Sequence, residues 1–376
     1  MNYVAFSPHF PPNYEMFTVR LNQAGLNVLG LGDTPFEKLS PALKENLRGY
    51  YQVSDMHNYD EVRRAMDYFS QKFGRLDWVE SHNEYWLEYE ASLRSDYDIQ
   101  GPKKEDIARV KRKSLMKEIY SQAGIEVARG RIVRDTQDAI NFIEEVGYPV
   151  VAKPDKGVGA ASTFKIEDAE QLDHFFNHKP EGPFLMEEFI QGQIVSFDGL
   201  TDQDGEVVFY TVNVFRQGVM ETVNQNLDFF YYSLREVPEI LVDIGLRTVE
   251  AFNIRARFFH LEYFYTNDDR VVALEVNMRP PGGLTTDMYN YANDFDIYAE
   301  YANVLKENQF YAEVKRKYFC AYLGRKHHIN YILPHAQLLE KFSNLIVHHQ
   351  PVEYVLRDAL GDYAYILRYA QFNDIL

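Results

Sequence analysis

Two apolar runs near residue 270, each with one carboxylate, limit what this chain can fold into more than any other feature. The runs are FFHLEYFY, which starts at Phe258, and VVALEVN, which ends at Asn277, and the polar turn Thr266–Asp269 separates them. Such runs on either side of a short polar turn predict a β-hairpin. Glu262 lies in the first run and Glu275 in the second, and alternation along a strand puts Asn277 on the same face as Glu275.

This hairpin carries the side chains of a metal site. Two carboxylates and an amide form an all-oxygen set of ligands that suits Mg²⁺. Arg279 follows beside a Pro-Pro-Gly-Gly turn, and a guanidinium group can bind phosphate or carboxylate oxygens with two hydrogen bonds. The alternative is a surface hairpin with solvated carboxylates, but Glu275 and Asn277 lie in a nearly continuous apolar strand. The stretch therefore indicates phosphoryl chemistry on a nucleotide.

The composition excludes several classes of protein. With 376 residues the chain is expected to form two or three domains, and its formal charge of −17 repels nucleic acid and anionic membranes. An anionic substrate therefore needs a local basic pocket. The single cysteine, Cys320, rules out an internal disulfide and is expected to be a buried structural thiol. No apolar run approaches the length of a membrane span and no signal peptide is recognisable, so we expect a cytoplasmic protein.

The N-terminal part of the chain alternates between strand-like and helix-like segments, which predicts parallel βαβ units. Strands are expected at 3–7, 27–31 and 76–80, and helices at 13–24 and 59–73. A basic helix is predicted next, over 105–122, and its charge alone favours a solvated face. The segment 126–188 has the pattern β-α-β-β-α-β of a small α+β layer, with strands expected at 126–134, 148–153, 162–166 and 183–188 and helices at 136–146 and 167–177. Further helices are expected near 238–252 and 285–306.

Two loops carry weaker signals. The segment KPDKGVGAAS, from Lys153 to Ser162, joins two strands, and its small residues can let backbone N–H groups surround a phosphate; a flexible hairpin turn is the equally weighted alternative. MEEFIQG, from Met186, is an apolar strand end followed by a glycine turn. Such a turn can present backbone groups to an adenine ring, although most stretches of this kind are simply a strand and a turn. The histidine pairs at 327–328 and 348–349 are expected to be structural or exposed.

Together these segments resemble the ATP-grasp superfamily, including the ATP-grasp domains of carbamoyl-phosphate synthase large chain and biotin carboxylase. They occur in the order of that superfamily from about residue 1 to 305. The resemblance implies a fold that combines α/β and α+β parts. It divides the chain into an N-terminal Rossmann-like (pre-ATP-grasp) domain at 1–104, a two-lobed ATP-grasp domain at 105–305 with a lid at about 126–188, and a small C-terminal α+β segment at 306–376.

The resemblance also implies roles for particular residues. The implied catalytic residues are Arg279 and Lys153, the metal ligands Glu262, Glu275 and Asn277, and the substrate contacts Glu84 and Arg279. The implied ATP contacts are Lys113, Lys153, Lys156, Gly157, Gly159, Ala160, Glu187, Glu188, Ile190 and Asp198. Many relatives follow the adenine segment with Gly-x-Glu, whose glutamate binds the ribose. Here the run is Gly192-Gln193-Ile194, and Asp198 or a neighbouring polar group is expected to substitute.

The implied activity is that of an ATP- and Mg²⁺-dependent ligase, which activates a carboxylate as an acyl phosphate, releases ADP and joins the acyl group to an amine or a similar nucleophile. One or two Mg²⁺ ions are implied, with Mn²⁺ as a substitute. The implied partners are small molecules rather than nucleic acid or a membrane, and a homodimer stays open. Two alternatives remain: an ATP-dependent carboxylase of the same superfamily, and a nucleotide-binding regulatory protein without turnover.

Overall fold

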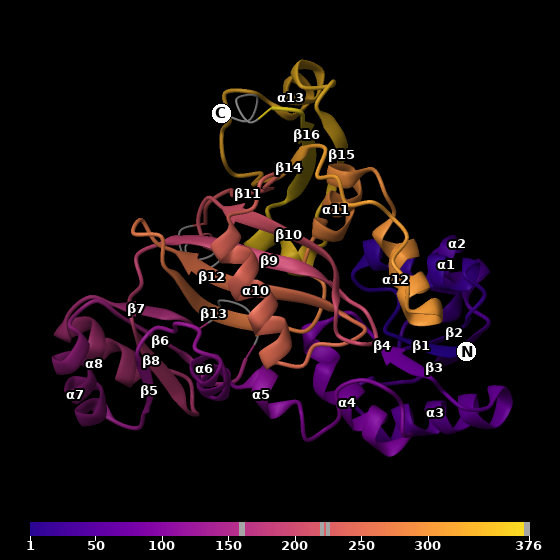
Figure 1. Ribbon diagram of the computed structural model, residues 1–376, viewed down its shortest axis with the longest axis horizontal. Coiled ribbons are helices and arrows are strands. Elements are labelled where there is room, and N and C mark those ends of the chain that lie inside the picture. Colours follow the sequence, from indigo (N-terminus) through magenta and orange to yellow (C-terminus); the bar gives the residue numbers. More distant parts are fainter. Residues whose placement is uncertain (158–161, 219–221, 223–225, 372–376) are drawn as a thin grey trace.

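The computed structural model describes residues 1–157, 162–218, 222 and 226–371, which form three β-sheets flanked by helices (Figure 1). No helix in this described part is both long and apolar enough to cross a membrane. Two predicted ATP contacts, Gly159 and Ala160, lie outside the described residues.

The first sheet is the predicted parallel one. Its strands follow the order β3-β2-β1-β4, with β1 at Asn2–Phe6, β2 at Asn27–Gly32, β3 at Gly49–Gln52 and β4 at Trp78–Glu80. Its helices are α1 (Glu15–Gln23), α2 (Pro41–Asn46), α3 (Tyr59–Phe73) and α4 (Leu87–Asp96), with short 3₁₀ segments at 12–14, 36–38 and 84–86. Because a short turn joins the carboxyl end of β4 to Glu84, this sheet delivers one of the predicted substrate contacts.

The second sheet, which we call the lid sheet, is antiparallel. It comprises β5 (Gly130–Val133), β6 (Val150–Pro154), β7 (Phe164–Ile166) and β8 (Phe184–Glu188) in the order β5-β8-β6-β7, with helices α7 (Thr136–Val146) and α8 (Ala169–His178). The predicted order β-α-β-β-α-β is confirmed. The strand expected at 126–134 is shorter than predicted, because its first part leaves the lid sheet and Val127 bridges Ala273 instead.

The single basic helix predicted before the lid sheet is wrong, because Arg112 interrupts it. Helix α5 covers Ala108–Lys111 and α6 covers Lys113–Gln122, while Arg112 has extended backbone angles, φ −108° and ψ 117°. Two contacts to Asp155, just after β6, explain the break. Arg112 Nε donates to one carboxylate oxygen at 2.9 Å, and the Ser114 N–H donates to the other at 2.8 Å. The interruption therefore ties α6 to the end of β6.

The third and largest sheet is antiparallel and follows the order β13-β12-β9-β10-β11-β14-β16-β15. Its strands are β9 (Gln193–Thr201), β10 (Val207–Phe215), β11 (Phe229–Ser233), β12 (Phe258–Tyr265), β13 (Val271–Asn277), β14 (Phe319–Arg325), β15 (Ile346–Pro351) and β16 (Tyr363–Tyr369). The predicted hairpin is β12–β13 at one edge. The C-terminal strands continue the same sheet towards the other edge (Figure 1). The division into three domains stays a prediction.

Helices cover part of the large sheet and connect its strands. Helix α10 (Glu239–Ala251) packs on β9, β12 and β13. The helix expected near 285–306 is in fact two, α11 (Thr285–Asn293) and α12 (Ile297–Glu307), because Asp294 adopts a left-handed conformation with φ 58°. A helix α13 (His335–Lys341), a 3₁₀ segment at 354–356 and α14 (Arg357–Leu360) connect the C-terminal strands. Cys320 is buried in β14, as predicted.

The packing of the large sheet predicts a penalty for any side chain at Gly199, in β9. A Cβ atom added there would lie less than 3.0 Å from the Phe209 carbonyl oxygen on β10 and from the Phe259 ring on β12. We expect Gly199→Ala to lower the free energy of unfolding by about 1–3 kcal/mol, because overpacking forces backbone shifts. Gly282→Ala is the control, since no atom lies within 4 Å of its added Cβ. Equal thermal midpoints for the two variants would contradict this packing.

Candidate nucleotide and metal site

A cavity of about 640 Å³ opens between the lid sheet and the large sheet. Its walls come from α6, both sheets, the linker 189–192, the loop after β13 and helix α14. Ten of the predicted site residues line it: Lys113, Lys153, Glu187, Glu188, Ile190, Asp198, Glu262, Glu275, Asn277 and Arg279. Predicted contacts that are far apart in the sequence therefore share one space.

The β12–β13 pairing places the predicted metal ligands. Its register sets Glu262 directly opposite Glu275. Asn277 is buried, and its amide nitrogen has no hydrogen-bond partner. Among the described residues, no three His, Cys, Asp or Glu side chains form a metal cluster, so a metal ion held here needs the amide and additional ligands from a substrate. This donor set fits Mg²⁺, which proteins commonly bind through one or two carboxylates together with phosphate oxygens.

Two basic side chains neutralise this carboxylate pair. Lys113 Nζ lies 3.1 Å from Glu275 Oε1. His260 Nε2 lies 2.9 Å from Glu262 Oε1, and its Nδ1 lies 2.5 Å from Asp198 Oδ1. Burial disfavours the imidazolium ion, but Asp198 and Glu262 outweigh burial and raise the pKa of His260 to about 9. The His260 imidazole is therefore charged at neutral pH.

The carboxylate of Asp198 is fully buried and bonded to protein partners. One oxygen contacts His260, and the other accepts hydrogen bonds from Ser196 Oγ at 2.7 Å and Asn213 Nδ2 at 2.6 Å. A ribose contact by Asp198 stays a prediction, and these three bonds argue against it. At the position of the expected ribose glutamate, Ile194 adds an apolar side chain to the cavity wall.

A second charge cluster lies around Glu187, near the end of β8. Lys153 Nζ is 2.5 Å from one oxygen of Glu187, and Lys117 forms a close ion pair with the other. Burial alone would raise the pKa of Glu187, but Lys153 and Lys117 outweigh burial and lower it. Burial lowers the pKa of Lys117, against the opposing effect of Glu187. Of these two lysines, Lys153 lines the cavity, so a phosphate group there can compete with Glu187 for its ammonium group.

The remaining predicted ATP contacts differ in where they lie relative to the cavity. Lys156 is exposed and pairs with a glutamate of α4 at 2.8 Å, and it does not line the cavity. The carbonyl oxygen of Gly157 accepts a hydrogen bond from Lys113 Nζ at 3.3 Å. Glu188 and Ile190 line the cavity at the turn between β8 and β9. Their roles as ATP contacts stay predictions.

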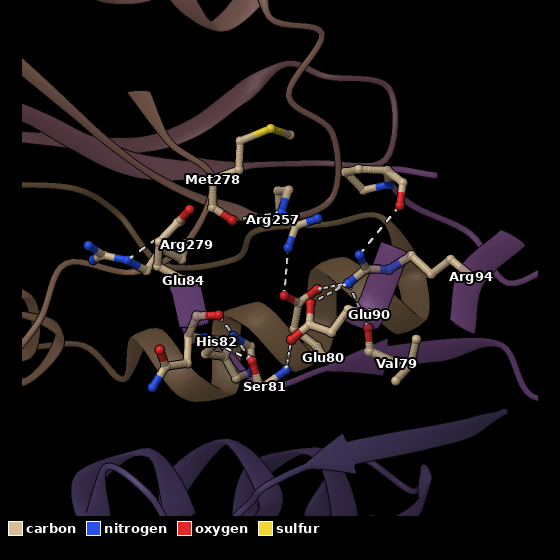
Figure 2. Close-up of polar contacts among 12 residues, drawn as sticks. Val79, Glu80, Ser81, His82, Glu84, Glu90, Arg94, Arg257, Met278 and Arg279 are labelled. Atoms are coloured by element: carbon tan, nitrogen blue, oxygen red, sulfur yellow. Dashed lines mark hydrogen bonds and ion pairs between the residues drawn. The ribbon is translucent and has the colours of Figure 1, made fainter. Parts of the chain in front are cut away.

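Glu84 approaches the site from the parallel sheet. Its Oε1 accepts a hydrogen bond from Lys111 Nζ at 2.9 Å. Its Oε2 is buried without a hydrogen-bond partner and lies 3.9 Å from Arg279 Nε, as Figure 2 shows. Burial raises the pKa of Glu84, although Lys111 and Arg279 oppose the shift. Arg279 lines the cavity and Glu84 does not, so Glu84 lies behind Arg279 as seen from the cavity.

The sequence analysis did not assign His260, Lys111 or Lys117 to the site. Alternation along β12 puts His260 on the same face as Glu262, so the sequence pattern could have placed it at the site. The solvated face predicted for the basic helix is wrong for its lysines. Lys111 and Lys113 are buried and Lys117 is mostly buried, because each meets a carboxylate from another element. Such partners depend on tertiary packing, which charge alone does not reveal.

Comparison with known proteins shows what the residues at this site are similar to. Residues 146–287 match the family model of the ATP-grasp domain. An L-arginine-specific L-amino acid ligase from Bacillus subtilis is 24% identical over 242 residues, which make up 62% of this chain and 58% of that protein. The chain thus spans less than two thirds of that relative.

Solved structures extend the likeness to the whole chain. An L-amino acid ligase from Bacillus licheniformis has a TM-score of 0.74 at 15% identity, and the match covers 100% of this chain and 94% of that chain. An N5-carboxyaminoimidazole synthetase from Staphylococcus aureus, solved with ADP, has a TM-score of 0.75 at 13% identity over the same shares. The chain therefore has the fold of these enzymes, and residues 146–287 match the ATP-grasp domain that the resemblance of its motifs predicted.

The contacts of His260 predict how stability depends on pH. Folding raises its pKa from 6.5 to about 9, so the imidazolium contributes stability that is fully present below pH 6.5 and is lost as the pH rises through 9. This contribution is on the order of 3 kcal/mol. In chelator-treated protein, we expect His260→Gln to lower the thermal midpoint most below pH 6.5 and progressively less towards pH 9.

His327→Gln is the control for this series, because His327 is exposed. It should leave the thermal midpoint close to that of the wild type at every pH. A deficit in His260→Gln that stays constant across the same pH range would show that the imidazole is not held as a cation.

Proposed function

We propose that this protein is an ATP- and Mg²⁺-dependent ligase that activates a carboxylate as an acyl phosphate and joins it to an amine or a similar nucleophile. One observation carries the proposal: a single cavity gathers two opposed carboxylates, a buried amide, two lysines and Arg279 from separate parts of the chain. The relatives named L-amino acid ligase support the same class of reaction.

The proposed reaction consists of two displacements. A carboxylate oxygen of the substrate attacks the γ-phosphorus of ATP, the bond to the β,γ-bridging oxygen breaks, and ADP leaves. The nucleophile then attacks the carbonyl carbon of the acyl phosphate and loses a proton, and phosphate leaves with the oxygen that came from the carboxylate. Because no protein group forms a covalent bond in this scheme, catalysis rests on positioning and on neutralising charge.

We assign Lys113 and Lys153 to the triphosphate. A glutamate now neutralises each of them, Glu275 at 3.1 Å and Glu187 at 2.5 Å, so phosphate oxygens would compete with these carboxylates for the ammonium groups. Once Lys113 turns to phosphate, Glu275 is free to join Glu262 and the nearby amide in holding Mg²⁺. When bound, Mg²⁺ would withdraw negative charge from the phosphate oxygens.

We assign Arg279 and Glu84 to the reacting substrates. The Arg279 guanidinium group can hold a carboxylate or the transferring phosphoryl group through two hydrogen bonds. Beside it, Glu84 offers a buried oxygen without a hydrogen-bond partner, which a donor group on the substrate would satisfy. A substrate with both an acidic group and a hydrogen-bond donor therefore suits this end of the cavity.

We assign to the lid sheet the role of excluding water from the cavity. It forms one wall of the cavity and the large sheet forms another, so movement of the lid sheet towards the large sheet would enclose the nucleotide. Enclosure protects an acyl phosphate from hydrolysis and strengthens the charge interactions around it.

Two alternative functions have some support. The fold likeness to N5-carboxyaminoimidazole synthetase favours an ATP-dependent carboxylase, although likeness of fold does not specify the substrate. Ile194, in place of the expected ribose glutamate, favours a nucleotide-binding protein without turnover. The retained lysines, carboxylates and Arg279 favour turnover. We further propose small-molecule substrates and a cytoplasmic location.

ADP release distinguishes these functions. We expect Mg²⁺-dependent release when ATP is supplied together with a carboxylate and an amine from a panel that includes free amino acids, and little release when either is missing. Release that needs bicarbonate in place of the panel carboxylate would favour the carboxylase. ATP binding without release on every combination would favour the protein without turnover.

Glu275→Gln tests the metal assignment. We expect it to reduce ADP release by about 100-fold or more, because one of the two opposed carboxylates loses its charge. Asp268→Asn is the matched control, since this exposed carboxylate lies in the turn of the same hairpin. Unchanged release in Glu275→Gln would sink the assignment of the hairpin as the metal site.

The C-terminal wall of the cavity is apolar and is expected to hold the side chain of a substrate. Phe229, Leu356 and Leu360 form part of this wall. Leu356→Ala should raise the KM for a panel substrate with a large apolar side chain by about tenfold, through lost contact area, and leave the KM for ATP within about twofold. Val355→Ala is the matched control, because Val355 is adjacent and exposed. Equal effects of the two substitutions would argue against a substrate at this wall.

A further inference from the structure

A polar network that the proposed mechanism does not use lies between the parallel sheet and the β12–β13 hairpin (Figure 2). Glu80, at the end of β4, places Oε1 2.6 Å from Arg257 Nη2 and Oε2 3.0 Å from Arg94 Nη2. Arg94 Nη2 also lies 2.8 Å from Glu90 Oε2, one turn earlier on α4. All four side chains are buried. Two carboxylates therefore face two guanidinium groups inside the protein.

Arg257 joins the two ends of the hairpin that carries the proposed metal ligands. It precedes β12, and its Nε donates a hydrogen bond to the carbonyl oxygen of Met278 at 3.0 Å. Met278 follows the end of β13 and precedes Arg279. Pairing between β12 and β13 ends at His260 and Asn277. Met278 and Arg279 thus lie beyond the ladder, and Arg257 supplies an anchor for them there.

The same network holds the turn that leads to Glu84. Glu90 Oε1 accepts a hydrogen bond from the Ser81 N–H at 2.7 Å, and the Ser81 hydroxyl accepts one from the Asn83 N–H at 3.0 Å. This turn is therefore fixed at its start by one end of the network, while the other end fixes the segment that precedes Arg279.

We infer that Arg257 is a positioning residue: by bridging the Glu80 carboxylate and the Met278 carbonyl, it sets the separation of Arg279 and Glu84 at the substrate end of the cavity. This role rests on the proposed function, which assigns those two side chains to the substrates. Arg279 Nε and Glu84 Oε2 lie 3.9 Å apart. One follows the hairpin and the other follows the parallel sheet, so their spacing depends on how these two units dock.

An arginine suits this task better than a lysine does. A buried ion pair adds little net stability, because the loss of hydration offsets the attraction between the charges. What the guanidinium group contributes is a fixed arrangement of its partners, since its planar shape directs several N–H groups at fixed angles. Arg257 uses Nε for the Met278 carbonyl and Nη2 for the Glu80 carboxylate, which gives one acceptor in each unit.

Backbone hydrogen exchange, measured without substrate, is the first test. It compares Arg257→Lys and Arg257→Gln with Arg255→Gln, a matched control because Arg255 is exposed and hydrogen-bonds to Asn253 and Asp204 instead. We expect faster exchange in the Arg257 variants in peptides that cover 278–284 and 81–87. Peptides of the lid sheet, and every peptide of Arg255→Gln, should exchange as in the wild type.

Steady-state kinetics on an active panel substrate is the second test. We expect the Arg257 variants to raise the KM for the carboxylate by about tenfold or more, because a small misplacement of the groups that hold a substrate is costly. The KM for ATP should stay within about threefold, since the two lysines assigned to the triphosphate are held by Glu275 and Glu187 rather than by Arg257. Arg257→Lys should be the milder variant, because it keeps the charge and loses only the planar arrangement of N–H groups.

Unchanged exchange at 278–284 and 81–87 would overturn this role for Arg257. Equal increases in both KM values would also overturn it, because a merely structural residue would affect both substrates alike. If Arg257→Gln does not fold, Arg257→Lys and Glu80→Gln decide by the same criteria. If the wild type turns over no panel substrate, the proposed function fails, whereas hydrogen exchange still decides whether Arg257 holds the two segments.

Discussion

Two negative charges opposite each other on neighbouring strands are the constraint on which the rest of the structure depends. Carboxylates that face each other directly across an antiparallel ladder repel, and the register of β12 and β13 imposes this arrangement on Glu262 and Glu275. His260 neutralises the first and Lys113 the second. A divalent cation with phosphate ligands satisfies the same constraint, which is why the arrangement fits both Mg²⁺ and a nucleotide.

The ion pairs around these two carboxylates hold together segments that are far apart in the sequence. Lys113 begins α6 because Arg112 leaves the helical conformation, and Arg112 does so where Asp155 holds it against the end of β6. The hairpin, α6 and the lid sheet are thus linked by charges rather than by a shared strand. On the other side of the hairpin, Arg257 links it to the parallel sheet. The cavity lies where these links converge.

Local patterns predicted much of this fold, and packing explains what they missed. Helices α3 and α7 have the bounds that periodicity predicts, and β12–β13 forms the hairpin that alternation and the polar turn require. The break at Arg112 does not follow from local sequence, because its partner Asp155 belongs to another segment. His260 lies in a recognisable pattern, but the partner that charges it, Asp198, lies 62 residues earlier. The last seventy residues carry little motif signal, so the sequence did not reveal that their strands extend the large sheet.

The central claim is that ATP activates a carboxylate in this cavity, and the fate of the carboxylate oxygen tests it most directly. A substrate labelled with ¹⁸O in its carboxylate is turned over with unlabelled ATP and an amine, and the released phosphate is analysed by mass spectrometry. If an acyl phosphate forms, each phosphate carries one ¹⁸O atom from the substrate. Phosphate that contains no ¹⁸O, or that takes up label only from ¹⁸O-bicarbonate, would contradict the claim.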